Sequence, residues 1–161
     1  MKIPFSPPDI TEAEINEVVA ALRSGWITTG PKVKELEGKL SKYCHTSKTV
    51  CLNSATAAEE LNFRVCGIGE GDEVIVPAYT YTATASAAIH CGAKVIFIDS
   101  QKDSTEMDYE KVAEAITERT KAIVAVDLAG IIADYDKLYE IVKAKKDLFV
   151  ELFKKLCLEA S

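Results

Sequence analysis

The sequence predicts an α/β fold with three layers, in which a mainly parallel sheet carries helices on both faces. Continuous apolar runs of strand length occur at residues 48–52, 73–77, 94–99 and 122–126. Such runs are typical of strands that are buried on both faces of a parallel sheet. The segments between them have helical apolar spacing, so strands and helices alternate and the crossovers should be right-handed. At 161 residues the chain is expected to be one domain or part of a larger one.

The composition excludes several classes of protein. The formal net charge of −6 argues against partners such as nucleic acid and anionic membrane surfaces. No apolar run reaches the ~18 residues of a membrane span, and the N-terminus has no apolar signal core. Five cysteines without a Cys-x-x-Cys pair predict reduced thiols in a cytoplasmic protein. His45 and His90 have no ligand spacing between them, so we expect no metal site.

The first third of the chain predicts an arm and two helices. Residues 1–10 contain three of the five prolines, which favours an extended arm. A capping box at residues 11–14 opens a helix that Gly25 closes, and Pro31 opens the next helix at its first position. In the loop between them, Trp26 either faces a ligand or packs between the two helices, and packing is the favoured interpretation.

Four further helices and a divergent tail are predicted after the first strand. Asp108 and Asp134 have the position of helix caps. The tail has an apolar stripe at helical period, so we expect a helix over residues 147–158 that covers sheet surface or a neighbouring chain. The four predicted helices lie at residues 55–66, 82–91, 109–117 and 135–146.

The turn around Ser54 has the features of an anion site. It follows a predicted strand and precedes a predicted helix, with Ser54 at the N-cap and Thr56 in the first helical turn. Backbone N–H groups, hydroxyls and the positive end of the helix dipole would converge there, and a phosphate is the natural ligand. The alternative is an ordinary capped helix without a ligand.

Polar residues also follow the other predicted strands. Ligands of parallel sheets bind at the carboxyl ends of the strands. The turn that contains Ser54 and the turn from Tyr79 to Tyr81 should therefore share one crevice. Asp99 and Asp127 follow two further strands and are expected at the same edge.

Six segments in this order and spacing resemble the N-terminal part of the DegT/DnrJ/StrS sugar aminotransferases. These are fold-type I enzymes that use pyridoxal phosphate (PLP). The resemblance covers about residues 3–146, which would form an incomplete large domain over residues 1–146, followed by a divergent helical tail over residues 147–161. The segments that carry it are residues 3–5, 24–31, 53–57, 69–75, 77–80 and 115–123.

The resemblance implies roles for matching positions. The cofactor phosphate would be held by the turn that also reads as an anion site, and an aromatic side chain would stack on the pyridine ring. The loop between the first two helices would lie near the sugar end of the substrate. The implied cofactor-binding residues are Ser54, Ala55, Thr56, Ala57 and Tyr81, and the implied substrate-binding residues are Trp26, Thr28, Thr29 and Gly30.

Two positions depart from the family pattern. Asp127 stands where many members carry histidine. Glu59 stands where the family usually has an aliphatic residue, which implies either a buried charge or a helix that is more exposed here.

The larger departure concerns catalysis. PLP enzymes need a lysine that forms the Schiff base and a carboxylate that pairs with the pyridinium nitrogen. In the family both lie downstream of the helix matching residues 135–146, and neither motif occurs in this sequence, so no catalytic residue is assigned. We therefore expect a truncated member of the family, inactive on its own and with weak or absent PLP binding. The family activity is amino transfer from glutamate to a keto-sugar on a nucleotide carrier, in polysaccharide or cell-surface sugar biosynthesis.

Two other functions remain open at this stage. The chain could be an assembly partner of a second chain that carries the missing half, or a module that binds phosphate or a nucleotide-sugar without chemistry. A missing half would leave sheet surface uncovered, so we expect a homodimer or a complementing chain.

Overall fold

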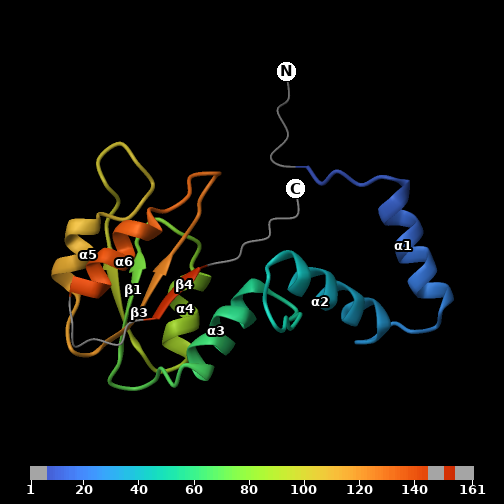
Figure 1. The fold of residues 1–161 in the computed structure, drawn as a ribbon, viewed down its shortest axis with the longest axis horizontal. Helices are drawn as coiled ribbons and strands as arrows, with labels where there is room; N and C mark the ends of the chain where they lie inside the picture. Colours follow the sequence, from blue (N-terminus) through green and yellow to red (C-terminus); the bar gives the residue numbers. More distant parts are fainter. Residues whose placement is uncertain (1–6, 145–150, 155–161) are drawn as a thin grey trace. The chain divides into compact units, whose positions relative to one another are not determined.

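The computed structural model describes residues 7–144 and the backbone of residues 151–154. These residues form two compact units, one ending at Leu52 and the other beginning at Asn53. Figure 1 shows the helices and strands of each unit, and each unit is described by itself below.

The first unit contains two helices. Helix α1 (Glu12–Arg23) begins with the expected capping box, in which the Ala13 amide donates to Thr11 Oγ1 (3.2 Å) and the Thr11 amide donates to Glu14 (2.6 Å). Helix α2 (Pro31–Tyr43) begins at the expected proline. Neither helix has a buried residue.

The second unit is built on a parallel sheet. Its strands lie in the order β2-β1-β3-β4, and each neighbouring pair is parallel. The strands are β1 (Glu73–Pro77), β2 (Lys94–Ile98), β3 (Thr120–Ala125) and β4 (Glu151–Lys154).

Helices cover both faces of this sheet, so the predicted three-layer α/β fold is confirmed. Alternate residues of β1 point to opposite faces: Ile75 lies in a core with residues of α5 and α6, whereas Val74 and Val76 lie in a core with residues of α3 and α4. All five residues of β1 are buried. The helices are α3 (Ala55–Val65), α4 (Ala83–His90), α5 (Tyr109–Ala115) and α6 (Tyr135–Ala144).

The strand expected over residues 48–52 is absent, and that prediction was wrong. No ladder pairs with this segment among the described residues, and side chains of α2 satisfy part of its polar groups instead. The Cys51 amide donates to Glu37 (2.9 Å), and Ser41 donates to the Thr49 hydroxyl (2.8 Å). An apolar run forms a strand only where a neighbouring strand accepts its backbone hydrogen bonds.

The prediction of a helix over residues 147–158 was wrong at residues 151–154. These four residues form β4 and pair in parallel register with residues 122–125 of β3. Pairing with an open sheet edge has overridden the helical spacing of the apolar residues. The remainder of the expected tail helix lies outside the described residues, as do Cys157, residues 3–5 and the last two residues of the helix predicted over 135–146.

An ion-pair network around the buried carboxylate of Glu73 joins the amino ends of the strands. The side chain of Glu73 is 2% exposed and accepts hydrogen bonds from Thr117 (2.6 Å), from Arg119 Nη2 (2.8 Å) and from Lys94 (3.4 Å). The hydrogen bonds from Thr117 and Arg119 lower the pKa of Glu73 from 4.5 to about 2. This network lies at the edge opposite to the candidate site.

Within the described residues, none of the helices combines the length and apolar character that crossing a bilayer would require.

Candidate functional site

The N-terminus of α3 presents open hydrogen-bond donors. Ser54 is the N-cap, and its hydroxyl accepts from the Ala57 amide at 3.1 Å. Among the described residues, the amides of Ala55 and Thr56 donate to no carbonyl or side chain. The first-turn residues are small, Ser54 and Ala55 are exposed, and Thr56 is half-buried. An anion can therefore approach the backbone at the positive end of the helix dipole.

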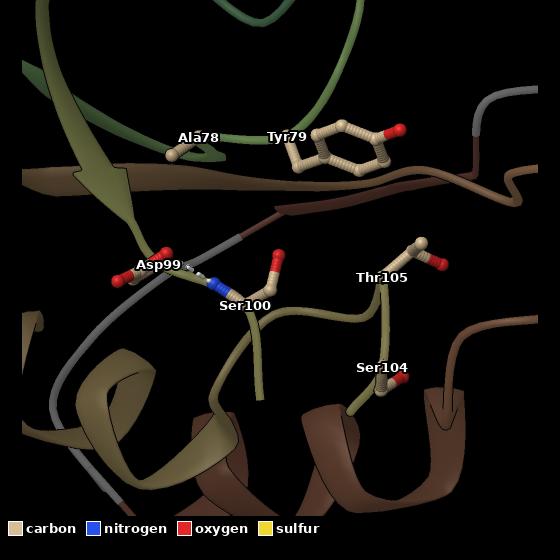
Figure 2. Close-up of a pocket in the computed structure, with 6 residues that line it drawn as sticks. All are labelled: Ala78, Tyr79, Asp99, Ser100, Ser104 and Thr105. Carbon is tan, nitrogen blue, oxygen red and sulfur yellow. Dashed lines mark hydrogen bonds between the residues drawn. The ribbon is translucent and has the colours of Figure 1, made fainter. Parts of the chain in front are cut away.

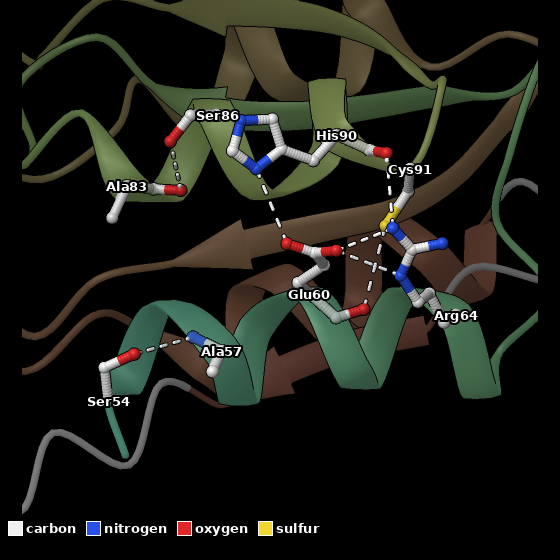
Figure 3. Close-up of polar contacts among 8 residues, drawn as sticks. All are labelled: Ser54, Ala57, Glu60, Arg64, Ala83, Ser86, His90 and Cys91. Carbon is white, nitrogen blue, oxygen red and sulfur yellow. Dashed lines mark hydrogen bonds and ion pairs between the residues drawn. The ribbon is translucent and has the colours of Figure 1, made fainter. Parts of the chain in front are cut away.

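Helix α4 runs beside α3 in the same direction, so the two N-termini lie at the same end of the pair (Figure 3). Contacts at their other ends hold the helices together. His90 Nδ1 lies 3.4 Å from Glu60 Oε2, and the Cys91 thiol donates to the Glu60 carbonyl at 3.7 Å. Arg64 pairs with Glu60 within α3 (2.6 Å) and donates to the His90 carbonyl at 3.4 Å. Burial raises the pKa of the Cys91 thiol, which keeps it neutral.

A turn over residues 78–82 joins the carboxyl end of β1 to the first turn of α4. Tyr81 precedes the helix, and its side chain is 75% exposed, so its ring is open to a planar ligand. The N-terminus of α3 therefore lies at the same end of the helix pair as the turn from Tyr79 to Tyr81. The cofactor roles of Ser54, Ala55, Thr56, Ala57 and Tyr81 stay predictions.

A second feature of this edge is a pocket of about 400 Å³ (Figure 2). It lies between the turn after β1 and the loop after β2. Asp99 is part of it, as expected for a residue at the carboxyl end of a strand. The residues that line it are Ala78, Tyr79, Asp99, Ser100, Ser104 and Thr105.

The residues expected near the sugar belong to the first unit. Trp26, Thr28 and Gly30 line one groove of about 520 Å³ between the end of α1 and the start of α2, and Thr29 contributes its carbonyl, which accepts from Trp26 Nε1 at 3.0 Å. The Trp26 side chain is 57% exposed, so the favoured interpretation, packing between the helices, holds only in part. A Cβ on Gly30 would lie 1.9 Å from Trp26 Nε1, so the indole needs glycine at this position.

The structure shows the surroundings of the two residues that depart from the family pattern. Asp127 Oδ1 accepts from the Ala133 amide (3.0 Å) and from the Tyr135 hydroxyl (3.1 Å), so it closes the loop between β3 and α6. Burial and the nearby Asp127 charge raise the pKa of Tyr135 to about 12. Both carboxylate oxygens of Glu59 are buried, which favours burial of this side chain over a helix that is more exposed here.

The fold defines a class: parallel α/β proteins, in which ligand sites lie along the carboxyl edge of the sheet. The family model of the DegT/DnrJ/EryC1/StrS aminotransferase family matches residues 8–151. The chain belongs to this family.

Relatives are known both by function and by structure. The chain is 42% identical over 139 residues to the UDP-4-amino-4-deoxy-L-arabinose–oxoglutarate aminotransferase of Shewanella sediminis, and 39% identical to the spore coat polysaccharide biosynthesis protein SpsC of Bacillus subtilis. Both matches cover 86% of this chain and 36% of the relative. A solved structure named "Putative sugar aminotransferase Spr1654", from Streptococcus pneumoniae in its PMP form, is 62% identical with a TM-score of 0.87, over 94% of this chain and 38% of that one.

A further solved structure of Spr1654 is named as its PLP form. The residues at the N-terminus of α3 in this chain fit the phosphate of PLP. Three features of the turn allow this fit. They are the open amides of Ala55 and Thr56, the Ser54 cap and the absence of any bulky side chain in the first turn. Open backbone N–H groups at a helix N-terminus are the donors that suit a phosphate dianion.

Sequence reasoning missed the hydroxyl-bearing residues Ser100, Ser104 and Thr105. The segment from residue 100 to residue 107 received no functional assignment from the sequence. Its position directly after a strand, with several hydroxyl side chains, was the signal that could have found it.

Proposed function

We propose that the residues at the N-terminus of α3 supply the phosphate-binding part of the PLP site of a nucleotide-sugar aminotransferase. Such an enzyme would move an amino group from glutamate to a keto-sugar in polysaccharide or cell-surface sugar biosynthesis. The observation that supports this most is the N-terminus of α3, where two open amides stand beside a capping serine in a member of this family. PLP, when bound, supplies the electron sink for amino-group exchange.

The residues of this chain would bind and orient. The Ala55 and Thr56 amides and the Thr56 hydroxyl would donate to the phosphate, while the Tyr81 ring would cover one face of the cofactor and exclude water. In the first unit, Trp26, Thr28, Thr29 and Gly30 would contact the sugar end of the substrate.

We further propose that these 161 residues do not transaminate by themselves. The sequence has no Asp-Ala strand motif and no Ser-x-x-x-Lys motif. The strand that follows α6 in this chain is β4, with the sequence Glu-Leu-Phe-Lys, so the aspartate expected on that strand is not there. Both groups would come from further residues, on the same polypeptide or on a second one.

A binding experiment tests the phosphate site. The 161-residue chain is titrated with PLP and with inorganic phosphate, and the amide signals of Ala55 and Thr56 are followed by NMR. Thr56→Val is expected to weaken binding by about five- to tenfold, since it removes one hydrogen bond to a charged ligand. The matched control is Thr46→Val in the first unit, whose hydroxyl donates to the Lys48 carbonyl. An unchanged isotherm for Thr56→Val would rule out this site.

A second experiment tests the absence of a covalent anchor. The chain is incubated with PLP, reduced with borohydride and digested, and the peptides are mapped by mass spectrometry. We expect scattered, substoichiometric pyridoxyl-lysine. Stoichiometric modification of one lysine would contradict the proposal that these residues are inactive alone.

A second candidate function is assembly with a chain that carries the remaining parts of the fold. The observation in its favour is coverage: the matched relatives are nearly three times as long as the region they share with this chain. Co-purification with a polypeptide bearing the Ser-x-x-x-Lys motif would support this role, and a cytoplasmic location would agree with the free thiols of Cys44, Cys51, Cys66 and Cys91.

A further inference from the structure

The turn that joins β1 to α4 is tied to the helix by a hydroxyl that is completely buried. Thr84 lies in the first turn of α4 and is 0% exposed. Its hydroxyl oxygen lies 3.2 Å from the hydroxyl oxygen of Thr80, the residue before Tyr81. We propose that Thr84 is a positioning residue that holds the backbone around Tyr81 and so aims the Tyr81 ring. This inference rests on the proposed function, in which that ring covers one face of PLP.

Packing alone does not explain a hydroxyl at this position. The other buried residues of α4 are all alanines, and a valine at position 84 would have the shape of threonine without a polar atom. A buried hydroxyl costs free energy unless it has a hydrogen-bond partner. Among the described residues that partner is the Thr80 hydroxyl. The contact between the two hydroxyls is therefore what a threonine adds here.

Thr84 restrains Tyr81 from both sides. The Thr84 amide donates to the Tyr81 carbonyl (3.2 Å), and the Thr84 hydroxyl contacts the residue before Tyr81. One residue of α4 therefore holds Tyr81 at its own carbonyl and through its preceding neighbour. Because the Tyr81 side chain is 75% exposed, little of the protein packs against it, so the direction of its backbone decides where the ring points.

The two ends of the turn are fixed by different contacts. At its start, the Ala78 amide donates to the Ile98 carbonyl of β2 (2.7 Å). At its end, Thr82 is the N-cap of α4, but its side chain makes no capping hydrogen bond. The contact between Thr80 and Thr84 takes the place of a cap. Its loss should loosen residues 80–82 and leave the attachment of the turn to the sheet in place.

A fixed ring direction favours the binding of a planar ligand. Two aromatic rings attract each other in offset-stacked or edge-to-face arrangements, so the ring must point in a defined direction. A side chain that is held before binding loses less conformational entropy than a mobile one. The phosphate donors belong to α3 and do not contact Thr84, so the contributions of the ring and of the phosphate can be measured separately.

The first test compares two ligands that share a phosphate group. The 161-residue chain is titrated with pyridoxine 5′-phosphate, which has the ring and phosphate of PLP but no aldehyde that reacts with lysine, and with inorganic phosphate. Amide NMR follows both titrations. Thr84→Val should weaken the binding of pyridoxine 5′-phosphate by about two- to tenfold, the contribution of one aromatic stacking contact. The affinity for inorganic phosphate should not change, because the N-terminus of α3 is intact.

The second test needs no ligand. Backbone order parameters from NMR relaxation report how firmly residues 80–82 are held in the free chain. They should fall in Thr84→Val, while unchanged hydrogen exchange in β1 shows that the sheet is intact. Thr84→Ser keeps the hydroxyl and should restore the order. Thr80→Val removes the same contact from its half-buried end, so it should reproduce the loss even if Thr84→Val does not fold.

Ser86→Ala is the matched control. It removes a hydroxyl from the same helix, and this hydroxyl donates to the Ala83 carbonyl within α4 (3.3 Å, Figure 3). Since Ser86 holds no residue of the turn with its side chain, neither the order parameters nor the affinities should change.

Three results would overturn the proposal. The first is unchanged order at residues 80–82 in both Thr84→Val and Thr80→Val, and the second is an equal loss of order in Ser86→Ala. The third is that Thr84→Ser does not restore the order. If the wild-type chain binds neither ligand, the proposed function fails, and the order parameters still decide whether Thr84 positions Tyr81.

Discussion

Helices α1 and α2 have no buried residue, whereas every residue of strand β1 is buried. The apolar side chains of α1 illustrate the contrast, since Val18 and Leu22 are about 60% exposed. Local signals therefore define the first unit, and tertiary packing defines the second.

The polar contacts of the two regions differ in the same way. In the first unit, Lys39 pairs with Glu35 at 2.7 Å and Lys32 pairs with Glu17, and all four side chains are exposed. In the second unit, the Glu73 carboxylate is buried under three hydrogen-bonding side chains. Exposed pairs are weakened by salt, whereas a buried carboxylate is screened much less.

The largest expected effect comes from the sheet. Ile75→Ala should lower the free energy of unfolding by about 2–5 kcal/mol, because it leaves a cavity in the core shared with α5 and α6. Leu22→Ala in α1 should change it by less than ~0.5 kcal/mol. Urea titration followed by circular dichroism measures both changes. Equal losses of unfolding free energy in the two variants would contradict the difference in packing between the units.

The next effect concerns the buried carboxylate. Glu73→Gln should cost about 1–3 kcal/mol, since it removes a charged acceptor from Thr117 and Arg119. The exposed neighbour Glu118, changed to Gln, is the matched control.

The same residue predicts a pH dependence. The folded pKa of Glu73 is about 2, below its ordinary 4.5, so its ionised form stabilises the fold. This contribution should be complete above about pH 4.5 and should be lost as the pH falls from 4.5 toward 2. The difference in unfolding free energy between wild type and Glu73→Gln should shrink over that range, and a constant difference would count against this assignment.

A smaller effect is expected at the first helix. Thr11→Ala removes the N-cap of α1 and should cost that helix about 1 kcal/mol. Because α1 has no buried residue, the loss should appear as faster hydrogen exchange in its first turn and not in β1 or β3. Slower exchange in the sheet for Thr11→Ser than for Thr11→Ala would show that the cap matters beyond its own helix.

The smallest effect is local and spectroscopic. Gly30→Ala should displace the indole of Trp26 and break its hydrogen bond to the Thr29 carbonyl. Trp26 is the single tryptophan of the sequence, so its fluorescence maximum should shift while the unfolding free energy changes little. Gly38→Ala, where a Cβ meets nothing within 4 Å, should leave the fluorescence unchanged.

The sequence predicted the parts of the fold in which local and tertiary preferences agree. Strand β1 has the predicted bounds, Thr11 and Asp108 cap the expected helices, and α3 starts at Ala55 after its Ser54 cap. In each case the residues that favour the element locally also meet its neighbours in space.

The wrong predictions concern segments whose secondary structure depends on a neighbouring element. Residues 48–52 are apolar enough for a strand, but Glu37 and Ser41 of α2 contact them in place of a second strand. Residues 151–154 have helical spacing, and the edge of β3 makes them a strand. The apolar period and the composition of a segment do not indicate which edge of a sheet is free to pair with it.

The sequence predicted the backbone donors at the N-terminus of α3, but it did not predict most of the residues that line the pocket. Ser54 and Thr56 follow from capping rules, and Asp99 follows from the position of strand ends. Ser104 and Thr105 received no role, although their place after a strand was a usable signal. The position of Ser104 beside the pocket depends on a hydrogen bond within its own loop, from the Glu106 amide.

Strand β1 packs against a different helix pair on each of its faces. A larger residue at position 75 would press on one layer, and a larger residue at position 74 or 76 would press on the other. Sequence drift in this strand should therefore be confined to swaps that conserve side-chain volume, while the outward positions of α1 can diverge freely.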